Sequence, residues 1–231
     1  MTESFEEELK KVLYENGADL VGFADLRGIK GSDFPYGVSV AIAVSPEVIL
    51  SIEEGPSRSY FDEYHHLNAK LNHLVRAGAE YLKDRGFKAR AQTTDTVIEF
   101  AEHRTALPHK TVATRAGIGW IGKCAVLVTK KYGSAVRLSS LITDAPLTYG
   151  TPVDIGLCGQ CSLCKDNCPA HAVSGELWSV NKERKDLYDP DLCRKKAREL
   201  SFAHIQEEIT LCGKCIQVCP FTRKYINSAI T

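Results

Sequence analysis

The cysteines in the last third of the chain have the type and spacing of iron–sulfur cluster ligands. Eight of the nine cysteines fall into two groups. The first group is the run Cys158-x2-Cys161-x2-Cys164-x3-Cys168-Pro169, and the second is Cys193 followed by Cys212-x2-Cys215-x3-Cys219-Pro220. The first run matches the bacterial pattern in which three closely spaced cysteines hold one [4Fe–4S] cluster and the fourth ligates another. The spacing therefore predicts two [4Fe–4S] clusters, which store and pass single electrons.

The same pattern predicts how the eight thiolates are shared between the clusters. We expect one cluster on Cys158, Cys161, Cys164 and Cys219, and the other on Cys168, Cys193, Cys212 and Cys215. Cys193 is assigned by counting, because it lies far ahead of Cys212. The alternatives are zinc sites and disulfides. Zinc sites usually pair two CxxC steps without a third step and a Cys-Pro ending, and disulfides are not expected where nothing marks a chain for export.

Composition limits the classes of partner that the chain can have. The 231 residues allow one large domain or two small ones, and a hydrophobic content of 44% supports a real core. Lys plus Arg equals Asp plus Glu at 29 each, whereas a protein that binds nucleic acid by neutralising phosphates is normally basic. The acidic start lacks the apolar region of a signal peptide, and no apolar run approaches the ~20 residues that span a bilayer. We expect a cytoplasmic protein without membrane contact.

Hydrophobic periodicity predicts an α/β layer domain before the cysteines. We expect helices over residues 3–16, 57–85 and 110–116, and strands over 20–24, 38–44, 125–129 and 136–143. The strand over 38–44 is apolar on both faces and therefore central. The stripe from Tyr60 to Tyr81 on the long helix is mostly core. Turn-forming residues around 148–152 predict a boundary near residue 150, with an α/β domain over 1–150 and a cluster domain over 151–231.

The segment Gly117-Ile-Gly-Trp-Ile-Gly-Lys-Cys124 matches the dinucleotide motif GxGxxG only in letters. Phosphate-binding glycine loops need a strand before and a helix after, and here the expected order is reversed. Trp120 would also block close approach of a pyrophosphate. Two interpretations stay open: a backbone packed against something flat and apolar, or a helix-to-strand turn with Trp120 in the core. Cys124 is correspondingly an inert buried thiol, or a ligand or redox group beside a cofactor.

Several motifs together resemble the epoxyqueuosine reductase family, which is related to reductive dehalogenases. They are Ala116–Lys123, Leu127–Thr129, Tyr132-Gly-Ser134, Leu141–Leu147, Tyr60–His65 and both cysteine groups, within residues 55–222. The resemblance implies an N-terminal cobalamin-binding α/β domain, similar to flavin nitroreductases and cobalamin-processing chaperones. It also implies a C-terminal, bacterial-type two-[4Fe–4S] ferredoxin-like domain that delivers electrons to the corrinoid cobalt.

The resemblance also implies roles for individual residues. Those expected to border the corrin are Tyr64, His65, Lys110, Gly117, Gly119, Trp120, Ile121, Gly122, Lys123 and Cys124. The family's proposed proton donor is an aspartate thirteen residues before the Ala-Gly of the glycine loop, and His103 occupies that place here. A histidine can donate a proton near neutral pH, although His103 could equally be a surface loop residue. The family continues into a C-terminal repeat region that helps hold tRNA, whereas this chain stops at Thr231, so we expect no tRNA partner.

Three functions follow as hypotheses. The first is a cobalamin-dependent iron–sulfur reductase that acts on a small substrate and takes electrons from a low-potential ferredoxin or flavodoxin. The second is a non-catalytic electron-transfer protein that reduces a corrinoid or flavin held by a partner. The third is a reductase with flavin in its N-terminal domain. The basic run Arg194–Arg198 could receive an acidic donor, but a solvated helix face explains it as well.

Overall fold

The computed structural model describes residues 4–230 and divides the chain into two compact units. The sheet unit comprises Met1–Ile42, Leu67–Ile118 and Arg137–Val153, and the cluster unit comprises Ala43–His66, Gly119–Val136 and Asp154–Thr231. The predicted start of the first helix at residue 3 and the domain limits at residues 1 and 231 lie outside the described residues. The domain boundary near residue 150 stays a prediction.

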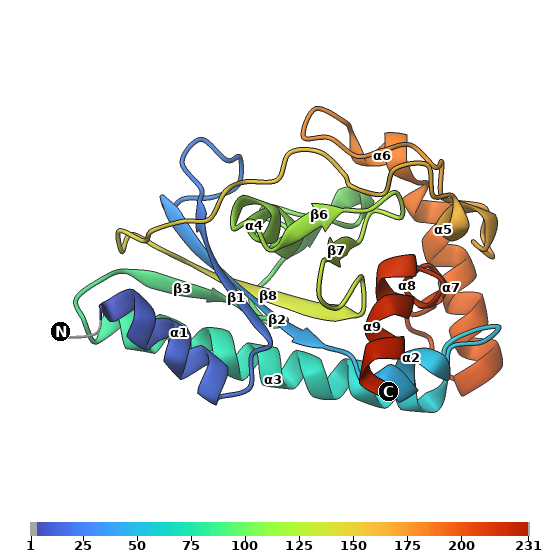
Figure 1. The fold of residues 1–231 in the computed structure, drawn as a ribbon, viewed down its shortest axis with the longest axis horizontal. Coiled ribbons are helices and arrows are strands. Elements are labelled where there is room, and N and C mark those ends of the chain that lie inside the picture. Colours follow the sequence, from blue (N-terminus) through green and yellow to red (C-terminus); the bar gives the residue numbers. More distant parts are fainter. Residues whose placement is uncertain (1–3, 231) are drawn as a thin grey trace. The chain divides into compact units, whose positions relative to one another are not determined.

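The sheet unit is built on a four-stranded sheet in the order β1-β2-β8-β3 (Figure 1). Its strands are β1 (Leu20–Asp25), β2 (Tyr36–Ala43), β3 (Ala89–Gln92) and β8 (Val136–Thr143). β1 runs antiparallel to β2, with Leu20 opposite Ala41, and β3 runs antiparallel to β8. The prediction that the apolar strand β2 is central is confirmed, because it lies between β1 and β8. β3 was not predicted from the sequence.

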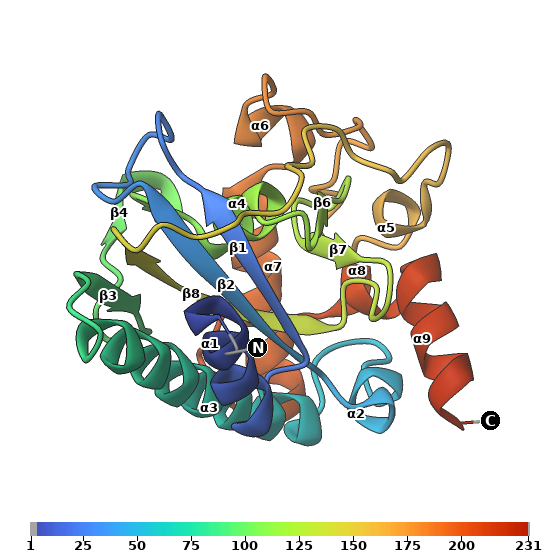
Figure 2. The ribbon, with the colours of Figure 1, turned by 60° about the vertical axis from the view of Figure 1, so that its left-hand side comes forward.

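Helices cover both faces of this sheet, as Figure 2 shows for α1 (Phe5–Glu15) and α3 (Arg58–Lys83) on one face and α4 (His109–Arg115) on the other. Gly78 brings α3 close to the sheet, since a Cβ there would lie 2.8 Å from Leu141 Cδ2. The neighbouring Ile142 belongs to the core cluster around Val112 of α4, because successive strand residues point to opposite faces. Leu67, Leu71 and Leu74 of the predicted α3 stripe are buried.

A short hairpin in the sheet unit carries His103. It consists of β4 (Glu99–Phe100), the turn η1 (Ala101–His103) and β5 (Arg104–Thr105). Glu102 and His103 have φ angles of 58° and 56°. Residues other than glycine disfavour this left-handed backbone region, and holding one there lowers stability by roughly 1–3 kcal/mol. Such residues cluster at functional sites.

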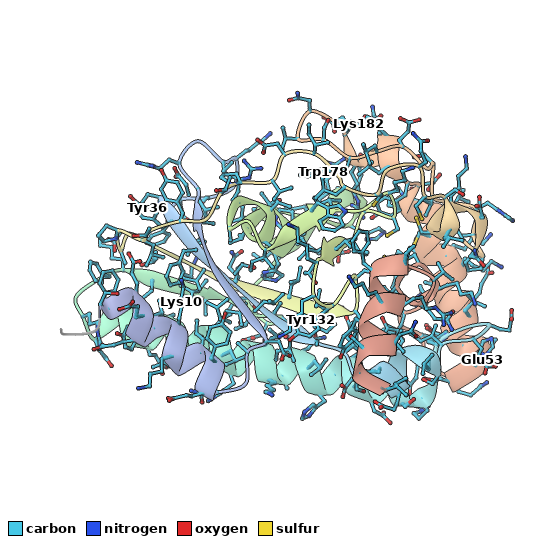
Figure 3. All side chains as sticks on the ribbon, in the orientation of Figure 1. Lys10, Tyr36, Glu53, Tyr132, Trp178 and Lys182 are labelled. Atoms are coloured by element: carbon cyan, nitrogen blue, oxygen red, sulfur yellow. The ribbon has the colours of Figure 1, made fainter. Side chains whose placement is uncertain are left out.

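The cluster unit joins three segments that lie far apart in the sequence. Its elements are α2 (Pro46–Leu50), β6 (Gly119–Ile121), β7 (Leu127–Thr129), α5 (Leu163–Asp166), α6 (Arg184–Leu187), α7 (Pro190–Ile205), α8 (Lys214–Gln217), α9 (Pro220–Ile230) and the first turns of α3. Lys214 Nζ donates to the carbonyl of Glu53 at 2.7 Å, and Arg58 pairs with Glu207 at 2.9 Å. Figure 3 labels Glu53 beside α2. Within residues 4–230, no helix is both long enough and apolar enough to cross a bilayer.

Candidate iron–sulfur site

One cavity of the cluster unit is lined by the four cysteines expected at the first cluster, Cys158, Cys161, Cys164 and Cys219, and also by Cys215, which is expected at the second. Two single-turn helices help to position its thiols. α5 carries Cys164, α8 carries Cys215, and the two helices contact each other. α9 begins at Pro220 directly after Cys219, where a proline at the first helical position loses no hydrogen bond. Both cysteine groups therefore meet at this cavity.

A second group of thiols forms around Cys168, the most buried ligand cysteine. Cys193 packs against the small core cluster that contains Cys168. It stands in the first turn of α7, whose N-cap Asp189 accepts from the backbone of Asp191 and Leu192. The N–H of Asp189 donates to the carbonyl of Ala172 at 2.9 Å, and the N–H of Ala172 donates to Cys168 Sγ at 3.4 Å. The start of α7 thus returns Cys193 to the first cysteine run.

The groups around this second set of thiols shift the pKa of Cys193 in opposite directions. Burial raises the pKa of the Cys193 thiol to about 11, and neighbouring Cys168 and Cys212 add to the effect while Arg184 counteracts it. Burial also raises the pKa of Cys212. Thiols that are neutral in the absence of metal must release their protons when iron binds. The site therefore favours an iron cluster, whose iron ions together replace the protons of several thiols.

The hairpin of β6 and β7 delivers a charged and a thiol side chain to the first cavity. The N–H of Ala125 donates to Gly122 O at 2.8 Å, and the N–H of Gly122 donates to Val126 O at 2.9 Å. This tight turn places Ala125 at a φ of 61° and presents Lys123 and Cys124, which both line the cavity. Lys123 is only 9% exposed. When iron binds and the cavity thiols ionise, the ammonium of Lys123 would offset part of their negative charge.

Packing within the chain accounts for the glycine loop. A Cβ on Gly119 would lie 2.2 Å from Val128 O, and one on Gly122 would lie 2.9 Å from Val128 Cγ2. In the sheet unit, a Cβ on Gly117 would lie 2.6 Å from Thr151 O. Trp120 is 1% exposed and packs edge-on against Phe221 at 4.9 Å between ring centroids. The interpretation as a turn with Trp120 in the core describes this geometry, and a corrin contact by these residues stays a prediction.

The order of elements around the loop agrees with the argument against a phosphate-binding motif. Helix α4 precedes the loop, and strands β6 and β7 follow it, which is the reverse of the order that the phosphate motifs need. Two details differ from the expectation. β6 itself was not predicted, and the strand expected over 125–129 begins at Leu127 because Ala125 and Val126 complete the turn.

The other residues expected at a corrin fall into both units. In the cluster unit, Tyr64 and His65 meet edge-on at 5.2 Å, and His65 also meets Phe61 edge-on at 4.5 Å. Ile121 is buried in β6. Lys110 stands in α4 of the sheet unit. The structure thus shows an aromatic cluster on the first turns of α3, and the binding roles of these residues stay predictions.

His103 has a carboxylate partner that the sequence analysis missed. Its Nδ1 lies 2.6 Å from Glu99 Oε1, and its side chain is 33% exposed. The two residues are four apart in the sequence, but a hairpin rather than a helix brings them together. Phe100 and Thr105 of the same hairpin line a cavity of about 310 Å³, whose wall also includes Arg90 and Gln92. Arg90 is already paired with Asp33, at 2.6 Å and 2.8 Å.

The spacing of the thiols in the cluster unit, with a third CxxC step and a Cys-Pro ending, favours [4Fe–4S] clusters over zinc sites. A [4Fe–4S] cluster spreads four thiolates over four separate irons. All nine cysteines are free thiols in this structure. In addition, the buried indole N–H of Trp120 has no partner among the described residues and is available to an acceptor.

Comparison with known families agrees with this chemistry. Residues 157–222 match the 4Fe-4S double cluster binding domain. The chain is therefore an iron–sulfur protein with a double-cluster domain.

The known relatives make the relationship more specific. The chain is 33% identical to the epoxyqueuosine reductase of Lactococcus garvieae over 178 residues, which are 74% of this chain and 44% of that protein. It is 32% identical over 177 residues to the enzyme of Pseudomonas aeruginosa, covering 73% of this chain and 45% of that protein. Over these residues the chain is a homologue of the epoxyqueuosine reductases, and it spans less than half the length of these two relatives.

Solved structures share the fold. A reductive dehalogenase whose structure suggests a mechanism for B12-dependent dehalogenation matches 97% of this chain and 34% of its own, with a TM-score of 0.74 at 20% identity. An epoxyqueuosine reductase with a tRNA-Tyr epoxyqueuosine-modified stem loop matches 94% of this chain and 65% of its own, with a TM-score of 0.60 at 21% identity. The predicted resemblance to epoxyqueuosine reductases is confirmed, and the fold is shared with a reductive dehalogenase.

Proposed function

We propose that this protein is a corrinoid-dependent iron–sulfur reductase, with the corrinoid held by its N-terminal α/β region and the clusters by residues 151–231. The observation that carries the proposal is the shared cavity of Cys158, Cys161, Cys164 and Cys219 in a chain homologous to epoxyqueuosine reductases. A bound corrinoid would supply a cobalt that accepts single electrons and reduces a substrate. The chain itself supplies the thiolates, the aromatic cluster of Phe61, Tyr64 and His65, and a proton donor.

His103 is the proposed proton donor for the reduced substrate. Glu99 accepts a hydrogen bond from Nδ1 and so orients the ring, which leaves Nε2 for proton exchange. Carboxylate–histidine pairs orient the imidazole in this way at many sites. The left-handed backbone at Glu102 and His103 holds the side chain on a tight turn beside the 310 Å³ cavity. This geometry supports a catalytic role more than a role as an ordinary surface loop residue.

The cavity beside the His103 hairpin fits a small, largely apolar substrate. Its lining includes Val97, Ile98, Phe100 and Leu107. Its one cationic side chain, Arg90, is balanced by Asp33, which removes most of the attraction for an anion. The equal numbers of acidic and basic residues give the chain no general attraction for RNA, and we do not propose a tRNA substrate.

Electrons would enter the cluster unit through a groove next to the first cavity. Leu163 and Val218, which line this groove, precede Cys164 and Cys219 in the chain, and Arg223 and Lys224 lie beside them. An apolar centre with basic side chains fits the acidic surface of a small low-potential carrier such as a flavodoxin. The predicted alternative over Arg194–Arg198 is less favourable, because Lys196 pairs with Glu199 and Arg198 with Glu208. Low-potential carriers of this kind, and thiols that must stay reduced, favour a cytoplasmic location.

An anaerobic titration of the cluster-loaded protein with cob(II)alamin tests the corrinoid proposal. We expect the EPR spectrum to change to the base-off form at one equivalent of protein, because a protein site that surrounds the corrin displaces its own nucleotide base. A free-cobalamin spectrum throughout, with both clusters reducible, would replace the proposal with the electron-transfer function. A yellow supernatant after acid precipitation of the purified protein would replace it with a flavin enzyme.

A further inference from the structure

Gln92 presents an unused hydrogen-bond acceptor to the cavity of about 310 Å³ beside the His103 hairpin. Its Nε2 donates to Ser140 Oγ at 3.0 Å, and no group within residues 4–230 donates to its Oε1. We propose that Gln92 determines specificity at this cavity, where Oε1 accepts a hydrogen bond from an N–H or O–H group of a largely apolar ligand. The inference rests on the proposed use of this cavity as the substrate site.

The pairing of β3 with β8 fixes the position of Gln92. Gln92 stands directly opposite Ser140 in the antiparallel register, so the two side chains point to the same face of the sheet. This is the face that α4 covers, because Ile142, two residues further along β8, belongs to the core cluster around Val112. Ser139 Oγ also donates to the carbonyl of Gln92 at 2.9 Å. The backbone and the amide of Gln92 are therefore both anchored to β8.

His109 sets the direction of the Ser140 hydroxyl. Its Nδ1 lies 2.9 Å from Ser140 Oγ. Burial lowers the pKa of His109 to about 4, so the imidazole is neutral at pH 7 and its Nδ1 can accept the proton of Ser140. A hydroxyl has one proton, and when that proton points to His109 the oxygen can only accept from Gln92. The NH2 end of the amide then faces Ser140, and Oε1 is left for the cavity.

The other groups around the cavity make this acceptor selective. Most of the lining is apolar, Arg90 is paired with Asp33, and Thr96 Oγ1 accepts from the N–H of Thr93 at 2.9 Å. A ligand with a suitably placed donor gains a hydrogen bond at Gln92, whereas one without a donor displaces water and leaves Oε1 without a partner. A site of this kind discriminates between ligands more strongly than apolar contacts alone.

Calorimetric titrations with indole and benzofuran test the inference on the cluster-loaded protein without added corrinoid. The two bicyclic molecules have nearly the same shape, and only indole carries an N–H. We expect the wild type to bind indole about tenfold more tightly than benzofuran, as one hydrogen bond contributes. Gln92→Met should remove this difference and leave the affinity for benzofuran within about twofold, because methionine fills similar space without an amide. Retained benzofuran binding also shows that the variant is folded.

Thr105→Val is the matched control, because it removes a different hydroxyl from the lining of the same cavity. It should keep the preference for indole, whereas Ser140→Ala should weaken the preference, because the amide of Gln92 loses its partner.

Four results would overturn the inference. They are equal affinities of the wild type for both ligands, no binding of either ligand, a preference for indole that persists in Gln92→Met, and a preference that disappears in Thr105→Val. The last result would assign recognition to the hairpin. Neither ligand is turned over in these titrations, so their outcome is separate from the EPR titration that tests corrinoid binding.

Discussion

Thiols from two cysteine groups meet in the cluster unit, and we propose that they bind the two clusters in crossed sets. The cavity of Cys158, Cys161, Cys164 and Cys219 also includes Cys215, so it draws on both cysteine groups, and Cys193 packs on the core cluster of Cys168. In the crossed scheme neither cluster could form from one run alone. The scheme assigns Cys219 to the first cluster and Cys168 to the second, and a single substitution at either residue tests this assignment.

Replacing Cys219 by Ser should damage only the first cluster, and replacing Cys168 by Ser only the second. A serine oxygen is a poorer ligand for a cubane iron than a thiolate, so each variant should lose or convert one cluster. Iron and sulfide analysis with EPR of the dithionite-reduced protein measures the outcome. Near eight irons in either variant, with unchanged spectra, would show that the crossed scheme is wrong.

His103→Ala should slow turnover of a corrinoid-loaded enzyme by about 100-fold, the lower range for loss of a general acid. Corrinoid binding should not change, because the proposed role of His103 is proton donation. Glu99→Gln is the matched variant: it keeps a side chain that can hydrogen-bond to Nδ1 but removes its charge. Its turnover should fall less than that of His103→Ala, because the imidazole that donates the proton is still present. Wild-type rates in His103→Ala would rule out the acid role.

At the residue scale, the sequence predicted which side chains form the site better than it predicted which residues they contact. Cysteine spacing alone identified the ligand candidates, because a cubane imposes short, regular steps on the chain. The Glu99–His103 pair escaped notice, since its geometry depends on two-residue strands that leave no periodic signal. Trp120 offered two interpretations because burial by protein and burial by a flat cofactor require the same residue type.

Among the elements, the connection between β7 and the start of α9 matters most for the first cavity. Gly133 has a φ of 58°, and a Cβ there would lie 2.2 Å from the backbone N of Thr222. The N–H of Ser134 donates to Thr222 Oγ1 at 3.0 Å, and the ring of Tyr132 packs edge-on against that of Tyr225. Figure 3 labels Tyr132. This contact anchors α9 directly after Cys219.

Gly133→Ala should therefore destabilise the cluster unit more than a simple left-handed alanine would. Gly86→Ala is the matched control, because Gly86 also has a positive φ but open space around it. The control should cost about 1 kcal/mol and Gly133→Ala at least about 2 kcal/mol more, since backbone atoms must move. Chemical denaturation of both variants measures the difference. Equal costs would mean that the close contact relaxes without penalty.

Charge reversal on α9 should slow reduction by an acidic carrier. In Arg223→Glu/Lys224→Glu the repulsion replaces attraction beside the groove, so we expect at least a tenfold lower rate at low salt and a flatter salt dependence. Lys83→Glu/Lys185→Glu changes the net charge equally at exposed positions that neither line the groove nor belong to Arg194–Arg198. Stopped-flow reduction by a flavodoxin compares them. Equal slowing by both pairs would favour general electrostatics over docking at α9.

Strongly patterned elements of the sheet unit were predictable, whereas its short strands and the helices α7 and α9 of the cluster unit were not. β8 was expected over the residues that it occupies, 136–143, and α3 was expected within two residues of its ends. β3, β4, β5 and β6 have two to four residues each and form only because distant partners pair with them. α7 had a usable signal in Asp189-Pro190, a capping residue followed by proline at the first helical position.

For the molecule as a whole, one buried histidine should make stability depend on pH. Burial, followed by the nearby charge of Arg137, lowers the pKa of His109 to about 4. Its Nδ1 lies 2.9 Å from Ser140 Oγ. The unfolded chain binds a proton at His109 near pH 6.5, whereas the folded chain does so only near pH 4. Stability from this group is complete above pH 6.5 and is lost as the pH falls toward 4.

The loss should amount to about 3 kcal/mol, at 1.36 kcal/mol for each pKa unit. Denaturant unfolding of the wild type and of His109→Gln between pH 4 and pH 7.5 isolates this contribution, because the glutamine keeps a polar side chain that does not titrate. The wild-type curve should fall more steeply toward low pH than that of the variant. Parallel curves would mean that His109 is protonated in the folded state.

The interleaving of the cluster unit has a consequence for the order in which the protein matures on the ribosome. Residues 43–66 and 119–136 leave the exit tunnel long before α9, yet they contact Lys214, Thr222 and Tyr225 from the last eighteen residues of the chain. During translation they must wait without those partners, with apolar residues such as Trp120 exposed to the nascent-chain environment. Iron delivered before α9 emerges would find the first cysteine run without Cys212, Cys215 and Cys219. We therefore expect cluster insertion to follow the emergence of α9, and a gene fragment that encodes residues 151–231 alone would lack residues 43–66 and 119–136 of the cluster unit.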